Sequence, residues 1–220
     1  MGTKSILSAR QTKLLNLIGA QKQITNHFYL GGGTALAEFY LHHRYSEDLD
    51  FFAEEEFDAQ SVSVFLKDIS KEMKIKKVDF EQSFNRNLFF LDFGGEVIKT
   101  EFTYYPFPRI EKRLKVGELA VDSLLDIAVN KIFTIYQKPR ARDFIDLYFI
   151  IKKEKWTVAD LVKKAKVKFD WHVDLLQLGS QFLQVETVKD YPRLIKKIKP
   201  DVWQEFFIDE AKGLDAKILE

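Results

Sequence analysis

The stretch FYLGGGTALAEFYLHHRYSEDLDFF, which runs from Phe28 to Phe52, decides the fold of this chain. Residues 28–30 form a short apolar run that is typical of a buried strand, and the glycines at 31–33 end that run abruptly. Residues 34–43 carry apolar side chains at three- and four-residue spacing, which predicts a helix. A second strand is expected to begin at about residue 48. Strand, glycine turn, helix and strand thus follow one another within a short segment.

Two aspartates stand at the start of this second strand. Successive side chains of a strand point to opposite faces, so Asp48 and Asp50 are expected to project from the same face. Carboxylates placed in this way repel each other unless a cation lies between them, and Mg²⁺ prefers oxygen ligands of this kind. Backbone N–H groups of a glycine turn, next to the N-terminus of a helix, can bind a phosphate chain. The stretch therefore predicts a magnesium-nucleotide site.

Length and composition limit the class of protein. The chain has 220 residues, and its 46% hydrophobic content supports a well-filled core. It contains no cysteine, which excludes disulfide frameworks and thiolate metal sites. The first residues lack the apolar core of a secretory signal, and no apolar run approaches the roughly 20 residues that span a bilayer. We therefore expect a cytoplasmic protein with no membrane partner.

The charges are segregated although the formal net charge is only +1. Between residues 47 and 58 there are seven acidic side chains and no basic one, whereas residues 138–168 contain ten basic and four acidic side chains. This distribution indicates an acidic region that could hold a metal and a basic region that could bind a polyanion.

The rest of the chain predicts an α+β fold. Strands are expected at 76–84, 88–93 and 96–105, with Gly94-Gly95 as a hairpin signal, and the prolines at 106 and 108 are expected to end the sheet. Helices are expected at 5–23, 58–73, 122–137, 143–153, 158–166, 171–184 and 201–219. This pattern predicts a catalytic core over residues 1–110 and a helical domain over residues 111–220.

A third carboxylate is expected beside the two aspartates, because nucleotidyl transfer commonly uses two metal ions held by shared acids. Glu101 is the candidate, since it lies late in a strand whose sheet could adjoin the aspartates. Asp92, just before the hairpin glycines, is the alternative. A glycine turn and an Asp-x-Asp pair are each unspecific alone, but their order within one short segment favours a functional site.

Several polar residues near this stretch allow both a functional and a structural interpretation. Thr34 could contact a phosphate or cap its helix. Arg44 and Ser46 precede the aspartates, and Arg44 could contact the nucleotide or form a surface ion pair with Glu47. His42 and His43 are adjacent on a predicted helix and therefore point apart, which disfavours a shared metal and leaves one of them solvated.

The helical half offers a second group of charged candidates. Lys131 lies in the middle of a predicted helix, where it could extend along apolar surface or reach a triphosphate. Arg142, Asp143 and Asp146 could form salt bridges near a helix end, or they could close the nucleotide site.

Three segments carry a resemblance to a known family. GGTALAEFYLHHRYSEDLDFF (32–52), IKTEF (98–102) and NKIFTIYQKPRARDFIDLYFI (130–150) resemble the AbiEii/AbiGii abortive-infection toxins. That family belongs to the DNA polymerase β-like nucleotidyltransferase superfamily and supplies toxins of type IV toxin-antitoxin systems. The resemblance implies a polymerase β-like mixed sheet with helices, followed by an all-helical C-terminal half.

The resemblance also implies roles for individual residues. It implies that Gly32, Gly33 and Thr34 hold the triphosphate, that Asp48 and Asp50 bind metal, and that Glu101 is the third acid and the base for the incoming hydroxyl. It further implies nucleotide-site roles for Lys131, Arg142, Asp143 and Asp146. This chain departs from the family pattern at Lys138, where arginine is common, and at Glu101, where aspartate is common.

The expected function is that of a Mg²⁺-dependent nucleotidyltransferase with a two-metal site, which transfers a nucleoside monophosphate from an NTP to an acceptor hydroxyl. The resemblance implies tRNA as an acceptor, which the basic segment 138–168 could contact, and a cognate antitoxin as a further partner. The alternatives are nucleotidylation of a protein side chain and a catalytically silent nucleotide-binding regulator.

Overall fold

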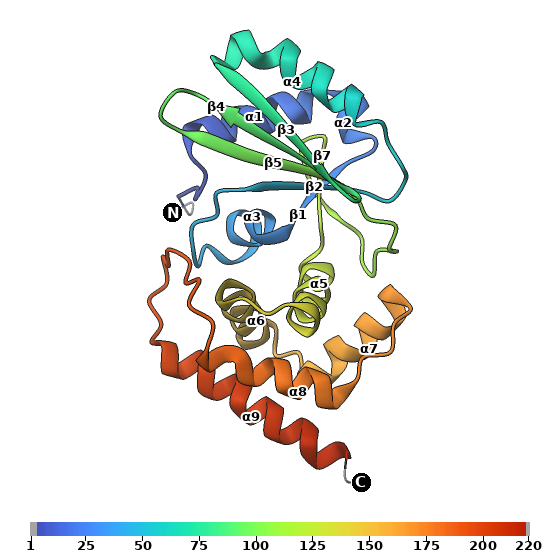
Figure 1. The fold of residues 1–220 in the computed structure, drawn as a ribbon, viewed down its shortest axis with the longest axis vertical. Helices are drawn as coiled ribbons and strands as arrows, with labels where there is room; N and C mark the ends of the chain where they lie inside the picture. Colours follow the sequence, from blue (N-terminus) through green and yellow to red (C-terminus); the bar gives the residue numbers. More distant parts are fainter. Residues whose placement is uncertain (1–3, 219–220) are drawn as a thin grey trace. The chain divides into compact units, whose positions relative to one another are not determined.

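This computed structural model describes residues 4–218, and side chains for residues 4–214. The chain divides into two compact units, which are drawn in Figure 1. The sheet unit comprises the residues up to Tyr40 together with Tyr45–Pro108 and Lys112–Ser123. The helical unit comprises Leu41–Arg44, Arg109–Glu111 and the residues from Leu124 onward. The domain division at residue 110 stays a prediction, while the compact units also exchange segments: Leu41–Arg44 belongs to the helical unit and Lys112–Ser123 to the sheet unit.

The described part of the sheet unit contains one seven-stranded mixed sheet in the order β3-β4-β5-β2-β1-β7-β6. The pairs β2/β5 and β1/β7 are parallel, and the other neighbouring strands are antiparallel. The strands are β1 (Tyr29–Gly31), β2 (Leu49–Ala53), β3 (Lys77–Ser83), β4 (Arg86–Asp92), β5 (Val97–Tyr104), β6 (Leu114–Val116) and β7 (Leu119–Val121). The five strands predicted from hydrophobic runs are confirmed.

The expectation that the sheet ends near Pro106 is wrong. After the prolines the chain forms the β6–β7 hairpin, and β7 returns to pair with β1. Each of these strands has three residues, which is too short for a period-two pattern to be recognised. Their turn contains Gly117 with φ +60°, a left-handed conformation that glycine adopts readily.

Two helices of the sheet unit, α1 and α4, start at side-chain caps. Ser8 and Gln11 form a capping box before α1, and the Asp58 carboxylate accepts a hydrogen bond from the N–H of Gln60 before α4. The predicted helix 5–23 is interrupted at Gln21. The helices are α1 (Ala9–Ala20), α2 (Lys22–Thr25), α3 (Gly32–Leu36), the π-helix η1 (Ala37–Leu41) and α4 (Ala59–Met73).

The two faces of the sheet differ in burial. In β2 every second residue is fully buried, and Phe51 stacks on Phe102 of β5 with ring centroids 4.9 Å apart. Helices α1 and α4 lie side by side along the sheet and bury their own apolar faces (Figure 1). The alternation places Asp50 on the face opposite Phe51, together with the half-buried Phe52.

The helical unit buries an aromatic core formed by Phe144, Phe182, Trp203 and Phe207. Its helices are α5 (Leu124–Gln137), α6 (Ala141–Glu154), α7 (Val158–Phe169), α8 (Leu175–Leu183), the 3-10 helix η2 (Gln184–Glu186) and α9 (Pro200–Ile218). The predicted helices are confirmed with shifted ends, and the predicted end at residue 219 lies outside the described residues. In the part of the chain that the structure covers, no helix is long and apolar enough to cross a membrane.

Candidate active site on the sheet

The glycine turn lies directly against Asp50. Strands β1 and β2 pair so that Gly31 is opposite Asp50, and Gly32 follows with φ +66°. A Cβ atom built on Gly32 would lie 2.6 Å from Oδ2 of Asp50. Glycine is therefore needed at position 32 both for its backbone conformation and for the close approach of the carboxylate.

Thr34 holds the backbone that leads into β2. Its side chain is fully buried, and its hydroxyl donates a hydrogen bond to the carbonyl oxygen of Asp48. The alternative in which Thr34 caps its helix is wrong, because α3 begins at Gly32 and Gly31 is the capping residue. Thr34 thus fixes the start of the strand that presents the two aspartates.

Sheet register brings Glu101 beside Asp50. Strands β2 and β5 are parallel, with Asp50 opposite Glu101, so both side chains project from one face. Asp92 pairs with Val97, which lies four residues from Glu101 along β5, about 13 Å at 3.3 Å per residue. The register therefore favours Glu101 over Asp92 as the third carboxylate.

Two cations that the sequence did not single out neutralise this carboxylate face. Arg86 donates two hydrogen bonds of 2.6 Å to Glu101, and Lys99 Nζ lies 2.9 Å from Oδ2 of Asp48 and 3.9 Å from Glu101. Lys99 stands two residues before Glu101 and shares its face, so the strand alternation could have identified it. The hairpin signal at Gly94-Gly95 predicted the pairing of β4 with β5, but Arg86 was missed because it precedes the strand predicted at 88–93.

The environment of Glu101 keeps its carboxylate ionised. Burial alone would raise the pKa of Glu101, but hydrogen bonds from Arg86 and Thr103 and the nearby positive charges outweigh burial and lower the pKa below its ordinary value. A carboxylate with a lowered pKa is a weak general base and a good ligand for a cation.

The donor set fits a hard divalent cation. Asp48, Asp50 and Glu101 offer only carboxylate oxygens, which Mg²⁺ prefers. Within the described residues, no group of three or more His, Asp or Glu side chains could hold a metal ion in the present arrangement. Lys99 and Arg86 provide the positive charge at this face instead, and a metal would compete with them for the same oxygens.

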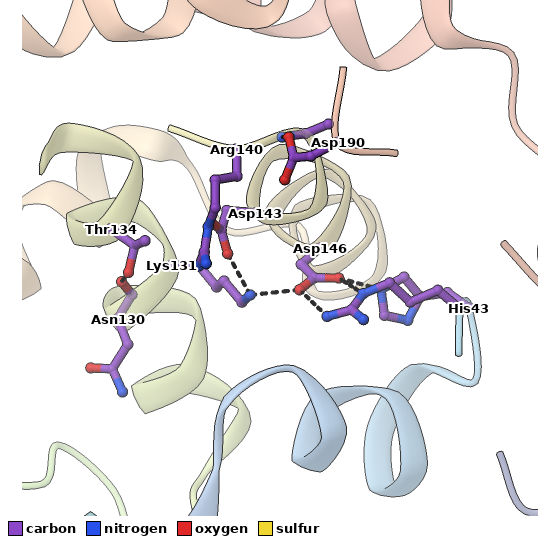
Figure 2. A network of polar contacts seen from close by, with 10 residues as sticks. His43, Asn130, Lys131, Thr134, Arg140, Asp143, Asp146 and Asp190 are labelled. Atoms are coloured by element: carbon purple, nitrogen blue, oxygen red, sulfur yellow. Dashed lines mark hydrogen bonds and ion pairs between the residues drawn. The ribbon is translucent and has the colours of Figure 1, made fainter. Parts of the chain in front are cut away.

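A second charged cluster, the Asp146 network, lies inside the helical unit (Figure 2). Lys131 Nζ is 2.7 Å from a carboxylate oxygen of both Asp143 and Asp146. Arg44 donates two hydrogen bonds to Asp146, of 2.6 and 2.9 Å, and His43 Nε2 lies 2.7 Å from the same carboxylate. Asp146 therefore joins three basic side chains at one point.

Burial controls protonation in the Asp146 network. Asp146 is fully buried, which alone would raise its pKa, yet Lys131 and Arg44 hold that pKa well below its ordinary value. Burial lowers the pKa of His43, so its imidazole is neutral at pH 7. A neutral ring that donates from Nε2 leaves Nδ1 as an acceptor, and Nδ1 has no hydrogen-bond partner among the described residues.

These contacts change the interpretation of several candidates. Arg44 is only 4% exposed, so the alternative of a surface arginine is wrong. Lys131 does not extend along apolar surface, because its ammonium is bound by two carboxylates. Ser46 accepts a hydrogen bond from Gln11 through its backbone carbonyl, and Arg142 is half-buried on α6. Direct nucleotide contacts by these four residues, and by Asp143 and Asp146, stay predictions.

The basic segment 138–168 is largely a surface feature. Six of its lysines are exposed, but Lys168 is buried and binds Asp126 at 2.7 Å, so its expected place in that surface is wrong. Asp126 also accepts the backbone N–H groups of Ile110 and Glu111. The exposed lysines are Lys138, Lys152, Lys153, Lys155, Lys163 and Lys164.

Comparison with known proteins agrees with this geometry. A family model described as "Nucleotidyl transferase AbiEii toxin, Type IV TA system" matches residues 16–216. An uncharacterized protein of Aquifex aeolicus (strain VF5) is 33% identical over 186 residues, which cover 83% of this chain and 84% of that protein.

Two solved structures from Helicobacter pylori share the fold. JHP933 has a TM-score of 0.59 and 21% identity, with 96% of this chain and 94% of that chain covered. A second protein, provisionally named a nucleotidyltransferase, has a TM-score of 0.62 and 20% identity, with 97% of this chain and 99% of that chain covered.

Proposed function

Because the chain belongs to the AbiEii nucleotidyl transferase toxin family, we propose that it transfers a nucleoside monophosphate from an NTP to a hydroxyl of RNA. The observation that carries this proposal is the placement of Asp50 against the Gly32 turn and opposite Glu101. This arrangement combines a glycine turn suited to phosphates with carboxylates suited to a cation. A tRNA is the proposed acceptor, and pyrophosphate is the second product.

Asp48, Asp50 and Glu101 are the residues that would hold Mg²⁺. A bound metal would lower the pKa of the attacking hydroxyl and would neutralise charge on the phosphates. The lowered pKa of Glu101 supports a role as a ligand rather than as the base that removes the proton. Thr34 keeps the strand that carries Asp48 and Asp50 in place through the Asp48 carbonyl.

The chain's own cations favour a polyanionic substrate at the same face. Lys99 and Arg86 are partly exposed, with side-chain exposures of 24% and 52%. Their charges lie next to carboxylates that would otherwise repel the phosphates of an NTP. They therefore lower the electrostatic barrier to binding a nucleotide at an acidic site.

The exposed lysines of the helical unit support an RNA acceptor. Side chains such as Lys163 and Lys164 on α7 offer charges that could contact an RNA backbone without reading its sequence. An acceptor and an NTP of this kind are present in the cytoplasm, which is the location we propose. Family membership also implies a cognate antitoxin as a partner.

The decisive experiment incubates the purified protein with each α-labelled NTP, Mg²⁺, total RNA and total protein. We expect label on RNA, and no label with the variant that combines Asp48→Asn and Asp50→Asn. Asp92→Asn is the matched control, since it makes the same change on the same sheet face but at a distance from Asp50. Label on a protein band would support protein nucleotidylation instead, and NTP binding without any label would indicate a regulator.

Binding of tRNA should weaken steeply with salt. Each phosphate contact releases counterions, so the logarithm of the affinity falls with the logarithm of the salt concentration. Replacement of Lys163 and Lys164 by serine should reduce that slope by about one for each lost contact. Weak binding without salt dependence would contradict a backbone-reading surface on α7.

A further inference from the structure

The most exposed large apolar side chain described in the sheet unit lies at the tip of the β3–β4 hairpin. Phe84 is 97% exposed, whereas ten of the 20 phenylalanines of this chain are buried in the core. A phenylalanine in this position gains nothing from burial. Its exposure therefore needs an explanation other than packing.

The backbone at Phe84 is also unfavourable for this residue type. Ser83 pairs with Arg86, so Phe84 and Asn85 form a two-residue connection, and Phe84 has φ +51°. The left-handed region at such turns favours glycine or asparagine, and a bulky residue there is strained. Neither the turn nor the core accounts for a phenylalanine at position 84. A residue that conflicts with local preference in this way often serves function.

The strand that follows Phe84 leads to the charged groups of the candidate active site. Arg86 stands two residues later, with its half-exposed guanidinium bound to Glu101. Lys99 lies on the adjacent strand β5 and contacts both Asp48 and Glu101. From Phe84 along the sheet, the register therefore gives the partly exposed Arg86 first, then Glu101, and then Lys99.

This combination matches the chemistry of single-stranded nucleic-acid binding. Proteins that hold single strands stack bases on aromatic side chains and neutralise phosphates with nearby cations. Leu88 pairs with Glu101, and Phe84 lies in the turn four residues before Leu88, so it is within about 14 Å of Leu88 even for a fully extended chain. A base stacked on Phe84 would therefore lie close, along the same RNA strand, to the hydroxyl that reacts beside Glu101.

We infer that Phe84 is a stacking platform for an unpaired base of the RNA acceptor, with Arg86 beside it to receive the neighbouring phosphate. The inference rests on the proposed function for the identity of the acceptor. Stacking tolerates any base, so this contact selects single-stranded RNA over duplex RNA rather than a sequence. It places the acceptor strand along the hairpin on its way to the carboxylates.

Anisotropy of a fluorescein-labelled, single-stranded RNA oligonucleotide, measured without NTP or Mg²⁺, tests this contact. We expect Phe84→Ala to weaken binding about 5- to 150-fold, which corresponds to 1–3 kcal/mol per stacked base. Phe84→Trp should retain binding, and its fluorescence should be quenched by the oligonucleotide. Phe84→Gly suits the turn but lacks the ring, and it should bind as weakly as Phe84→Ala.

Val97→Ala is the matched control, because Val97 is an apolar side chain of the same sheet that is 58% exposed. Its binding of RNA should equal that of the unchanged protein. Thermal unfolding of each variant establishes that the fold is retained. A duplex oligonucleotide of the same sequence should bind with little dependence on Phe84.

Failure of this inference can be distinguished from failure of the proposed function. If no NTP is ever transferred but Phe84→Ala still weakens binding of single-stranded RNA, the stacking platform stands and the transfer proposal falls. If RNA is labelled and Phe84→Ala changes neither RNA binding nor the KM for RNA, the platform is overturned. Absence of any RNA binding, or a change in oligomeric state as the sole effect of Phe84→Ala, would also overturn it.

Discussion

The sheet unit and the helical unit each contain a cluster of ion pairs with similar distances, but the two clusters differ in exposure. In the carboxylate face of the sheet, Asp48 and Lys99 are separated by 2.9 Å and have side-chain exposures of 35% and 24%. In the Asp146 network, Lys131 and Asp146 are separated by 2.7 Å and have side-chain exposures of 10% and 0%. The two ion pairs join the same types of charged group at similar distances, but only the pair on the sheet is accessible to water.

This difference separates a site that can exchange partners from one that cannot. A partly exposed ion pair contributes little to stability, so a metal or a phosphate can replace one of its members. A buried pair is different, because removal of one member leaves an uncompensated charge in a medium of low polarity. The carboxylate face is therefore suited to ligands, and the Asp146 network is suited to holding α5, α6 and the segment Leu41–Arg44 together.

Asp146→Asn should produce the largest effect, a loss of about 3–5 kcal/mol in the free energy of unfolding. The variant leaves the buried cations of Lys131 and Arg44 without their shared carboxylate. Urea unfolding measures the change, and Asp209→Asn, at an exposed ion pair on α9, is the control. A loss no greater than that of the control would mean that the network is not structural.

Asp50→Asn should have the next largest effect, and on activity rather than on stability. We expect nucleotidyl transfer to fall about 100- to 1000-fold, about 2.7–4 kcal/mol in the activation barrier, as for loss of one charge-stabilising group. The free energy of unfolding should change by less than about 1 kcal/mol. Transfer from labelled NTP and urea unfolding are measured on the same preparation. Full activity in this variant would remove the carboxylate face from the mechanism.

Stability should fall on acidification in two stages, to which the Asp146 network contributes both times and Glu101, whose pKa is lowered from 4.5, adds in the second. The pKa of His43 is lowered from 6.5, so below about pH 6.5 the unfolded chain binds a proton that the folded chain does not, and stability decreases. The pKa values of Asp143 and Asp146 are lowered from 3.8, so their contribution is present above that pH and is lost as the pH falls below it.

Each proton contributes at most about 1.4 kcal/mol per pH unit to this slope. Urea unfolding at a series of pH values between 7 and 3 measures it. His43→Phe should remove the first stage and leave the second. A stability that is constant from pH 7 to pH 5 in the unchanged protein would contradict the assignment of a neutral, buried His43.

Lys99→Met should have the smallest effect on stability, about 1 kcal/mol or less, because its ion pair with Asp48 is partly exposed. Lys131→Met, the same substitution in the Asp146 network, should destabilise the protein far more. Unfolding of the two variants under identical conditions gives the comparison directly. Equal losses would show that exposure does not distinguish the two clusters.

Local pattern was sufficient for much of the fold. The alternation of β2 predicted that Asp48 and Asp50 share a face, and helical spacing located most of the helices. These predictions succeed because strand and helix periods are properties of consecutive residues. The glycine turn was recognisable for the same reason, since its conformation depends on the residue type at Gly32.

Local sequence patterns could not identify strands and charged residues that pair across long distances in the chain. The β6–β7 hairpin returns to β1 through strands of three residues, which carry no measurable period. Arg86 lies before the start predicted for its strand, and the role of Arg44 depends on Asp146, about 100 residues later. Sequence could identify these residues as charged but not as partners.

What the sequence alone determined is therefore the order of elements and the chemical type of the site, from the glycine turn to the paired aspartates. Tertiary structure decided which charges meet and how much water reaches them. It placed Lys131 and Arg44 in a closed interior and left Lys99 and Arg86 partly open. The physical reason is that a side chain's direction follows from its neighbours in the chain, whereas its burial depends on segments that pack against it from elsewhere.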